Sequence, residues 1–446
     1  MKQSVFLGCA VCLALAMLAH GEDATPPAGF TALFNGKDLT GWRGGSTFDH
    51  RKLLAMPEDQ RKAQIEKWTK TLTAPGKNDK PHWYAENNEL VNDGGGDYAT
   101  TEKDYGDFEL LLDYKTVPLA DSGIYLRGVP QVQIWDKDNP KDKKNGCDRG
   151  SGALWNNSEG NPGKWPLVLA DKPFGEWNHF RILMTGSRVS VWLNDKLTVD
   201  HAILENYYDR KTPILPKGPI ELQTHGGEIR WRNIFLREIG SDEADKILAS
   251  HGEDAGFKSI FNGKDLEGWA GPIENYEVVD GAIRCKPGKG GTPYYNEEFS
   301  DFVARLEFKL PPGGNNGLAI RYPGKGDTAY AGMCELQVLD DNYEQATKSK
   351  IDPRQAHGSV YGVVAAARGY QHPNGQWNFQ EVTVKGSTIK VELNGTIILD
   401  ADVSKVDPET FMAKSKHPGL TRTSGYFGFA GHNDPVAFRA IRIKKI

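Results

Sequence analysis

The chain has 446 residues, a formal net charge of −5 and 25% charged residues, and its length allows two or three domains. It has no block of lysine or arginine, so composition argues against nucleic acid or an anionic membrane surface as a partner. Of its five cysteines, the three beyond residue 21 include no Cys-x-x-Cys pair, which argues against a disulfide-stapled scaffold and a zinc cluster.

Residues 1–21 are typical of a cleaved secretory signal peptide. An apolar stretch over residues 5–18 follows a positive start, and Ala19-His20-Gly21 offers a small-x-small cleavage site. The stretch is too short to span a bilayer comfortably. We therefore expect a secreted or periplasmic bacterial protein with no membrane attachment after cleavage. Lipid modification at Cys9 or Cys12 is the less favoured alternative, because both lie inside the apolar stretch. Removal of the signal would leave three cysteines, enough for at most one disulfide.

A decapeptide occurs twice, as "LFNGKDLTGW" from Leu33 and as "IFNGKDLEGW" from Ile260. The spacing is far longer than the roughly 20–50 residues of a solenoid repeat. Further segments match in the same order: 103–128 with 297–322, 131–136 with 335–340, 151–155 with 357–361, 175–197 with 375–397, 218–226 with 425–433, and 230–239 with 437–446. The sequence thus predicts a duplicated domain, with a first copy at 28–239, a linker at 240–256 and a second copy at 257–446.

The matched segments have the alternation of β-strands. In "RVSVWLN" and "TIKVELNG", β-branched and aromatic residues recur with period two between turn residues. Many short strands and almost no helical periodicity predict an all-β fold, with two tandem antiparallel jelly-roll sandwiches. A propeller or barrel is the alternative.

Residues 46–80 have no counterpart in the second copy. The segment "DHRKLLAMPEDQRKAQIEKWTKTL" is rich in helix formers and carries a sparse apolar face at Leu53, Leu54, Ile65 and Trp68. We expect one or two short helices inserted into the first copy, either over a cleft or as a surface decoration.

Alternation along the strands groups polar side chains on one face of each copy. The predicted groups are Arg127, Gln131, Gln133, Gln223 and His225 in the first copy, and Arg321, Glu335, Gln337 and His432 in the second. Converging polar and titratable groups are expected in a ligand cleft. An outer sheet face is also normally polar, but retention of Arg, Gln and His in both copies favours a site.

Other residues could contribute to that site. Trp135 and Trp155 of the first copy could stack on sugar rings or belong to the core. Asp136 and Asp340 end their strands with the opposite alternation and could orient a loop, cap a turn or bind Ca²⁺. The acidic segment at 136–148 lacks the spacing of a calcium loop, so no cofactor is expected, with calcium as the alternative.

Taken together, "LFNGKDLTGW", "YGDFELLLDYK", "SGIYLRG", "QVQIWD", "GEWNHFRI" and "GPIELQTHG…RWRNIFLREI" resemble the 3-keto-disaccharide hydrolase domain family of secreted bacterial proteins. The resemblance covers both copies apart from the insert and linker. It implies a concanavalin A-like, glucanase-like jelly-roll sandwich and, as substrates, glycosides oxidised to a ketone at sugar C3.

The implied chemistry is elimination followed by hydration, since a C3 ketone acidifies the C2 proton and lies β to the glycosidic oxygen. The resemblance implies that Arg321 stabilises the enolate, that Glu335 and His432 share base and acid duties, and that Gln337 binds sugar hydroxyls. Substrate contacts are also expected from Asp340 and, in the first copy, from Gln131, Gln133, Asp136, Gln223, Trp135 and Trp155. Arg127 and His225 are the first copy's catalytic candidates.

The two copies depart from the family pattern in different places. Gln131 stands where the second copy has Glu335, and glutamine cannot take a proton at neutral pH, so we expect the second copy to carry more of the turnover. Competing hypotheses are a non-catalytic, lectin-like carbohydrate-binding protein and a structural envelope protein. The sequence decides neither the sugar and linkage nor the oligomeric state.

Overall fold

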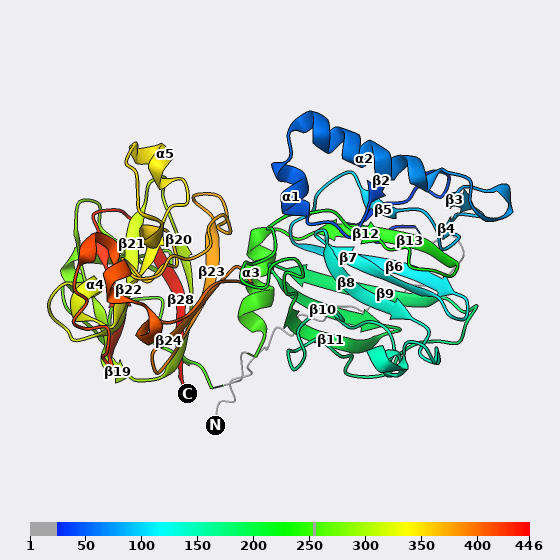
Figure 1. Ribbon diagram of the computed structural model, residues 1–446. Helices are drawn as coiled ribbons and strands as arrows, with labels where there is room; N and C mark the ends of the chain where they lie inside the picture. The colour runs from blue at the N-terminus through cyan, green and yellow to red at the C-terminus, as the bar shows by residue number, and fades with distance from the viewer. Residues whose placement is uncertain (1–24, 253–255) are drawn as a thin grey trace, which may run out of the picture.

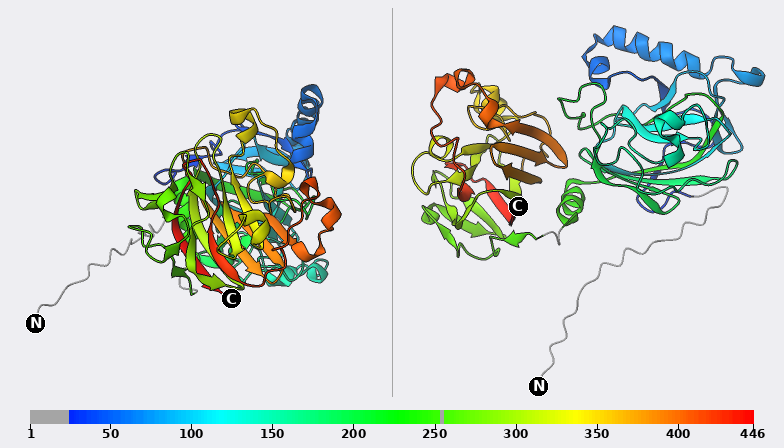
Figure 2. Two further views of the ribbon diagram at one scale, coloured as in Figure 1. Left: turned by 90° about the vertical axis from the view of Figure 1, so that its left-hand side faces the viewer. Right: turned by 60° about the horizontal axis from the view of Figure 1, so that its bottom comes forward.

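The computed structural model describes residues 25–252 and 256–446; the proposed signal peptide lies outside the described residues. The chain forms two β-sandwiches side by side, with helix α3 (Ser241–Ser250) between them (Figures 1 and 2). The predicted fold class, all-β with two tandem antiparallel sandwiches, is confirmed. In the described part of the chain, no helix is long and apolar enough to cross a membrane.

The first copy contains an eight-stranded sheet of order β11-β10-β9-β6-β13-β4-β3, with β1 paired to β13, facing a five-stranded sheet of order β2-β5-β12-β7-β8. The strands of the larger sheet are β1 (Thr31–Ala32), β3 (Trp83–Glu86), β4 (Glu89–Asn92), β6 (Phe108–Thr116), β9 (Asn178–Thr185), β10 (Arg188–Leu193), β11 (Lys196–Ile203) and β13 (Ile229–Glu238). Those of the smaller sheet are β2 (Trp42–Gly45), β5 (Tyr98–Thr101), β7 (Asp121–Leu126), β8 (Val129–Trp135) and β12 (Glu221–Leu222).

The second copy repeats this topology, with sheets of order β25-β24-β23-β20-β28-β17-β16 (β14 paired to β28) and β15-β19-β26-β21-β22. Its larger sheet contains β14 (Lys258–Ser259), β16 (Tyr276–Val279), β17 (Ala282–Cys285), β20 (Phe302–Lys309), β23 (Trp377–Lys385), β24 (Thr388–Leu393), β25 (Thr396–Asp402) and β28 (Ala437–Lys445). Its smaller sheet contains β15 (Trp269–Ala270), β19 (Tyr294–Phe299), β21 (Asn315–Tyr322), β22 (Cys334–Leu339) and β26 (Gly425–Phe429), and β18 (Gly290–Gly291) pairs with β27 (Gly431–His432).

Alternating side chains build the core of each sandwich. Along β20, Phe302, Ala304, Leu306 and Phe308 are buried, while the residues between them are partly exposed. The buried apolar residues form one cluster in each copy. Because each copy encloses its own core, each has the anatomy of a domain. Cys147, Cys285 and Cys334 are free and buried.

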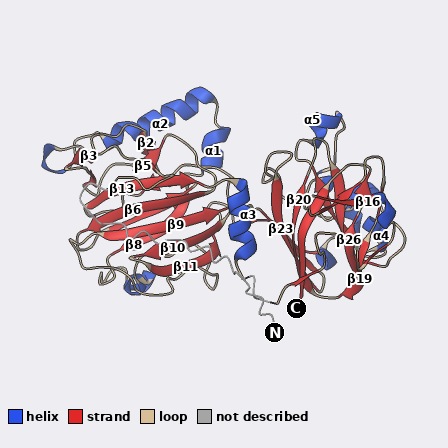
Figure 3. Ribbon diagram, turned by 180° about the vertical axis from the view of Figure 1, so that it is seen from behind, coloured by secondary structure: helices blue, strands red, loops and turns tan. Residues whose placement is uncertain are grey.

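The copies differ in the helices added to the smaller sheet. In the first copy, α1 (His50–Ala55) and α2 (Glu58–Leu72) form the predicted helical insert, and α2 packs on the edge strand β2 (Figures 1 and 3). Trp68 and Leu72 are buried in that contact, whereas Leu54, predicted to lie on the apolar face, is exposed. A Cβ at Gly44 would lie 2.1 Å from the Trp68 backbone, so the close approach requires glycine.

The second copy carries its addition at the opposite edge of the sheet. Residues 323–333 join β21 to β22 and contain α4 (Thr328–Ala331), whereas only Arg127 and Gly128 join β7 to β8 in the first copy. A further helix, α5 (Tyr343–Thr347), follows β22. The remaining short 3₁₀ turns are η1 (Lys77–Asp79), η2 (Lys143–Asn145), η3 (Cys147–Arg149), η4 (Ile273–Asn275), η5 (Pro353–Gln355), η6 (Val403–Lys405), η7 (Pro408–Thr410) and η8 (Met412–Lys414).

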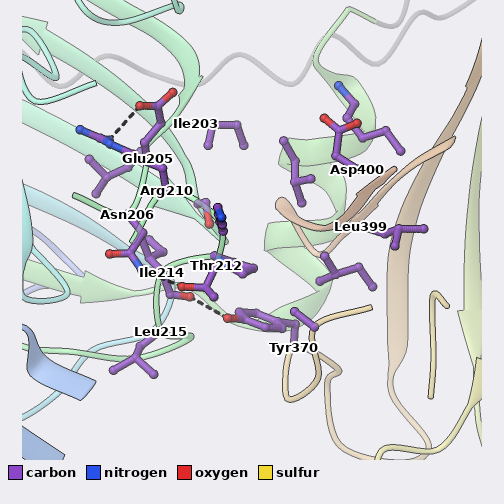
Figure 4. Close-up of a pocket in the computed structure, with 18 of the residues that line it drawn as sticks. Ile203, Glu205, Asn206, Arg210, Thr212, Ile214, Leu215, Tyr370, Leu399 and Asp400 are labelled. Atoms are coloured by element: carbon purple, nitrogen blue, oxygen red, sulfur yellow. Dashed lines mark hydrogen bonds and ion pairs between the residues drawn. The ribbon is translucent and has the colours of Figure 1, made fainter. Parts of the chain in front are cut away.

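The two copies contact each other directly. Arg188 of β10 forms a two-pronged ion pair with Glu392 of β24, and α3 packs against both β9 and β23. A groove of about 1150 Å³ remains between the copies. Figure 4 shows Tyr370 reaching from one wall to Ile214 on the other, where its hydroxyl donates to the Ile214 carbonyl at 2.9 Å.

Candidate functional site

The second copy has a cavity of about 340 Å³ over strands β21 and β22. Glu335 on β22 lies at its floor, opposite Ala319 and diagonal to Gly317 on β21. A Cβ at Gly317 would lie 2.3 Å from the Glu335 carboxylate. Glycine at this position therefore lets the carboxylate fold over its neighbouring strand.

Glu335 contacts a histidine that arrives from a different strand. His432 Nε2 lies 3.4 Å from Glu335 Oε1; the Glu335 side chain is 6% exposed and that of His432 is 47% exposed. This hydrogen bond raises the pKa of His432, against the opposing effect of its partial burial. The site therefore pairs a buried carboxylate with a histidine that holds its proton to higher pH than a free imidazole and can reach solvent.

Gln337 lies beside the pair and has an unused acceptor. Its Nε2 donates to Asn315 Oδ1 at 2.6 Å, whereas its buried Oε1 has no partner within the described part of the chain. A buried acceptor without a partner costs free energy. A ligand hydroxyl entering the cavity would supply that partner.

Aromatic hydroxyls form part of the cavity wall. Tyr330 lies on α4, which Asp327 caps by accepting from the Ala329 N–H at 2.9 Å. Tyr361 lines the same cavity, and its backbone N–H donates to the Glu335 carbonyl at 3.0 Å. Partial burial raises the pKa of Tyr361, so its hydroxyl stays a neutral donor at physiological pH.

Arg321 does not line this cavity, and the predicted grouping is wrong for this residue. Its guanidinium is buried, donates to the carbonyls of Ser300, Gly386 and Arg422, and pairs with Asp301 at 2.9 Å. The prediction from side-chain alternation failed because Arg321 has a φ of +47° and lies in an irregular stretch of the β21–β26 pairing. This left-handed backbone turns the side chain away from the polar face.

Arg127 makes the equivalent contacts in the first copy and is likewise outside the predicted group. With a φ of +54°, it donates to the Gly106 carbonyl at 2.9 Å and pairs with Asp107 at 2.7 Å. Both arginines therefore hold the start of a long central strand, which explains their retention in both copies without a role at the cavity.

Asp136 and Asp340 are anchors of the loops that follow their strands. Asp340 accepts from the backbone N–H groups of Gly313 and Asn342, and Asp136 accepts from those of Leu119 and Asp138. Of the three roles that the sequence left open, loop orientation is the one that these contacts support. The proposed substrate contact remains a prediction.

The first copy retains a histidine–carboxylate pair, but its carboxylate comes from another strand. His225 Nδ1 lies 2.8 Å from Asp121 Oδ2, and Asp121 Oδ1 accepts from Gln133 at 2.7 Å. Gln131, which replaces Glu335, donates to Gln133 instead. The contact with Asp121 raises the pKa of His225. Strand alternation did not predict this pair, although Asp121 occupies the aligned position of Asn315 and was a usable signal.

The centre of the first copy's polar face is filled by larger side chains. Glu221, Gln223 and Tyr125 occupy positions where the second copy has Gly428, Ala430 and Ala319, and all three are buried. Gln223 Nε2 lies 3.5 Å from the Tyr125 hydroxyl. Burial raises the pKa of Glu221 to about 8, so this carboxyl is largely protonated at pH 7.

The two predicted stacking tryptophans pack against each other. Trp135 and Trp155 form an edge-to-face pair with ring centroids 5.7 Å apart, and their indole N–H groups donate to the Gly150 and Asn145 carbonyls. Trp135 lines a separate cavity at the end of the sandwich. Across the described ranges, no group of three His, Cys, Asp or Glu side chains is arranged to hold a metal ion.

Comparison with known proteins agrees with the duplicated architecture. The model of the 3-keto-alpha-glucoside-1,2-lyase-like domain family matches residues 29–237 and again 256–444. A 3-keto-disaccharide hydrolase of Bacteroides thetaiotaomicron is 27% identical over 248 residues, which cover 47% of this chain and 85% of that protein. Two candidate glycosyl hydrolases of known structure from Parabacteroides distasonis are 22% and 26% identical. They cover 44% and 43% of this chain and 97% and 99% of their own, with TM-scores of 0.37 and 0.36.

Proposed function

The chain belongs, in both of its copies, to the 3-keto-alpha-glucoside-1,2-lyase-like domain family, and we propose that it is an exported enzyme that cleaves the glycosidic bond of 3-keto-glycosides or 3-keto-disaccharides. The substrate class comes from the family and from the name of the curated relative. The observation that carries the proposal is the Glu335–His432 pair, 3.4 Å apart, at the cavity of the second copy.

The pair supplies the two proton transfers that elimination needs. The Glu335 carboxylate takes the C2 proton, whose acidity the C3 ketone raises, and the C2 electron pair forms the enolate. Collapse of the enolate breaks the C1–O bond, forms the C1=C2 double bond, and protonated His432 donates to the leaving oxygen. Water then adds its hydroxyl to C1 and a proton to C2. The net result is hydrolysis, without the pair of carboxylates used in direct glycoside hydrolysis.

The enolate oxygen needs a hydrogen-bond donor, the role that the family resemblance implies for Arg321. We assign this role to Tyr361, because it lines the cavity, its hydroxyl stays neutral, and its backbone N–H donates to the Glu335 carbonyl. A fixed donor aimed at developing charge stabilises a transition state more than a ground state. Gln337, with its free Oε1, is positioned to accept from a sugar hydroxyl.

Turnover is assigned mainly to the second copy. Its acid is buried at a cavity, whereas in the first copy the equivalent Gln131 cannot exchange a proton and the His225 side chain is 62% exposed. A proton shuttle in an open, wet setting loses much of its electrostatic advantage.

The direct test is incubation with 3-keto-trehalose and with a 3-keto-β-glucoside, with products followed by NMR in D₂O. Elimination and hydration place deuterium at C2 of the released 3-keto sugar, whereas direct hydrolysis leaves hydrogen there. A control incubates the released sugar alone with the enzyme to measure later exchange. Binding of either compound without product would instead identify the lectin-like alternative.

A further inference from the structure

The first copy has a cavity of its own, which the proposed chemistry does not use. It has a volume of about 320 Å³ and lies where the end of β6, the end of β8 and the start of β9 meet. The volume is enough for one or two sugar rings. It is separate from the His225–Asp121 pair, since neither residue lines it.

Aromatic rings form the apolar part of this end cavity. Tyr114 and Trp135 are buried at its back, and Phe174 lines it with 42% of its surface exposed. The Trp135 ring is fixed by the bond from its N–H to the Gly150 carbonyl, 2.9 Å long. Rigid aromatic rings of this kind offer flat faces on which the C–H groups of a sugar ring can pack.

The polar part of the lining balances in charge. Asp138 and Asp171 are matched by Lys137 and Lys172, and the Asp171 Oδ2 atom is held by the Ser151 N–H at 3.0 Å. An apolar ligand would remove these charged groups from water without compensation. A net-charged ligand would meet a like charge. The lining therefore suits a neutral ligand with many hydroxyl groups.

In the second copy, hydrogen bonds close the position that corresponds to the end cavity. Gln371 stands at the position of Asp171; its Nε2 donates to the Leu339 carbonyl at 2.7 Å, and its Oε1 accepts from the Asp341 N–H at 2.9 Å. Leu339 and Asp341 correspond to Trp135 and Lys137. Asn374, in place of Phe174, bonds to Asp340. The opening thus depends on residue changes specific to the first copy.

Exposed apolar residues continue beyond this cavity. Leu119 is 57% exposed in the turn held by Asp136, and Leu169, 48% exposed, precedes the cavity-lining stretch from Asp171 to Phe174. Exposed apolar groups beside a pocket commonly mark a binding surface. They would extend contact with a ligand longer than one ring.

We propose that this end cavity is a saccharide-binding site for neutral, unoxidised sugar units, distinct from the cleavage site of the second copy. Trp135 and Phe174 pack on the sugar, and Asp171 accepts from its hydroxyls. Such a site would hold the chain near saccharides that carry or accompany the substrate. It extends the proposed function to binding, yet does not depend on the cleavage chemistry.

The test measures binding of trehalose and maltotriose, which lack the ketone, by isothermal titration calorimetry on the full chain. Asp171→Gln copies the second copy's bridge and should weaken binding at least ~10-fold, about 1.4 kcal/mol. Phe174→Ala, at an exposed position, should weaken it by ~3- to 10-fold. The matched control Asn374→Ala in the second copy should leave binding unchanged.

Thermal unfolding of each variant verifies that the fold is intact, and Phe174→Ala provides the second measurement if Asp171→Gln is unstable. No heat of binding for either sugar, or binding that both first-copy variants leave unchanged, would overturn the proposal. Binding lost in these variants while 3-keto-trehalose is still cleaved supports it. Failure of cleavage with binding intact concerns only the proposed enzyme activity.

Discussion

The two copies share one strand order, but they use the polar face of the smaller sheet differently. The first copy adds α1 and α2 at the β2 edge and fills the middle of the face with Glu221, Gln223 and Tyr125. The second keeps small residues there and adds α4 at the β22 edge, where the cavity forms. Additions at opposite edges therefore place any functional pocket at different positions on the same scaffold.

The carboxylate has also changed strand between the copies. It comes from β22 in the Glu335–His432 pair and from β7 in the Asp121–His225 pair. Neighbouring strands present side chains on the same face, so a carboxylate from either strand can reach the histidine. The difference teaches that duplicated sites should be compared by their geometry. A comparison of aligned positions alone would conclude that the first copy has lost its acid, whereas a neighbouring strand supplies it.

The largest expected effect comes from Glu335→Gln, which copies the first copy's Gln131 into the second. The change is nearly isosteric but removes charge and proton transfer, so kcat on 3-keto-trehalose should fall by about 10²–10⁴-fold with a modest change in KM. Steady-state kinetics measures both. Retention of wild-type kcat would mean that the second copy is not the main catalyst.

The next effect is on stability. Arg321→Met removes a buried guanidinium that bonds three carbonyls and Asp301, and should lower the free energy of unfolding by about 3–5 kcal/mol. Arg127→Met is the matched variant in the first copy. Urea unfolding gives the stability, and kcat per folded molecule should stay near that of the wild type. If the Arg321→Met variant folds but has no activity, Arg321 has a catalytic role after all.

A smaller effect is expected on the pKa of His432, which Glu335→Gln should change without changing that of His225. The contact with Glu335 raises the pKa of His432, so the acid form, and activity that needs it, is lost only as pH rises through that raised value. The contribution of protonated His432 to the free energy of unfolding is likewise full below the ordinary histidine pKa of about 6.5, and it is lost as pH rises through the raised pKa. NMR titration should show the His432 pKa falling in Glu335→Gln while that of His225 is unchanged. A constant His432 value would contradict the pairing.

The smallest effect is expected from His225→Ala. Because turnover is assigned to the second copy, kcat should change by less than ~3-fold, below the ~10²-fold that a general acid–base group contributes. Asp121→Asn is the matched change to its partner. Loss of turnover in both variants, with Glu335→Gln still active, would transfer the activity to the first copy.

Much of the architecture could be predicted because it depends on local rules. The repeat, the alternating strands and the helix-forming composition of 46–80 led to two sandwiches and a helical insert, as the structure has them. The family assignment was confirmed as well. The grouping of Glu335, Gln337 and His432 around one cavity also followed from strand alternation.

What the sequence alone determined was therefore the composition of each strand face, since side-chain direction alternates along any regular strand. Only the tertiary structure decided where that alternation stops: at Arg127 and Arg321, a left-handed backbone turns a polar-face residue inward. It also decided which strand supplies each acid and which cavities open, as with Asp121 and the end cavity beside Phe174. These depend on contacts between residues far apart in the chain, which neither periodicity nor spacing encodes.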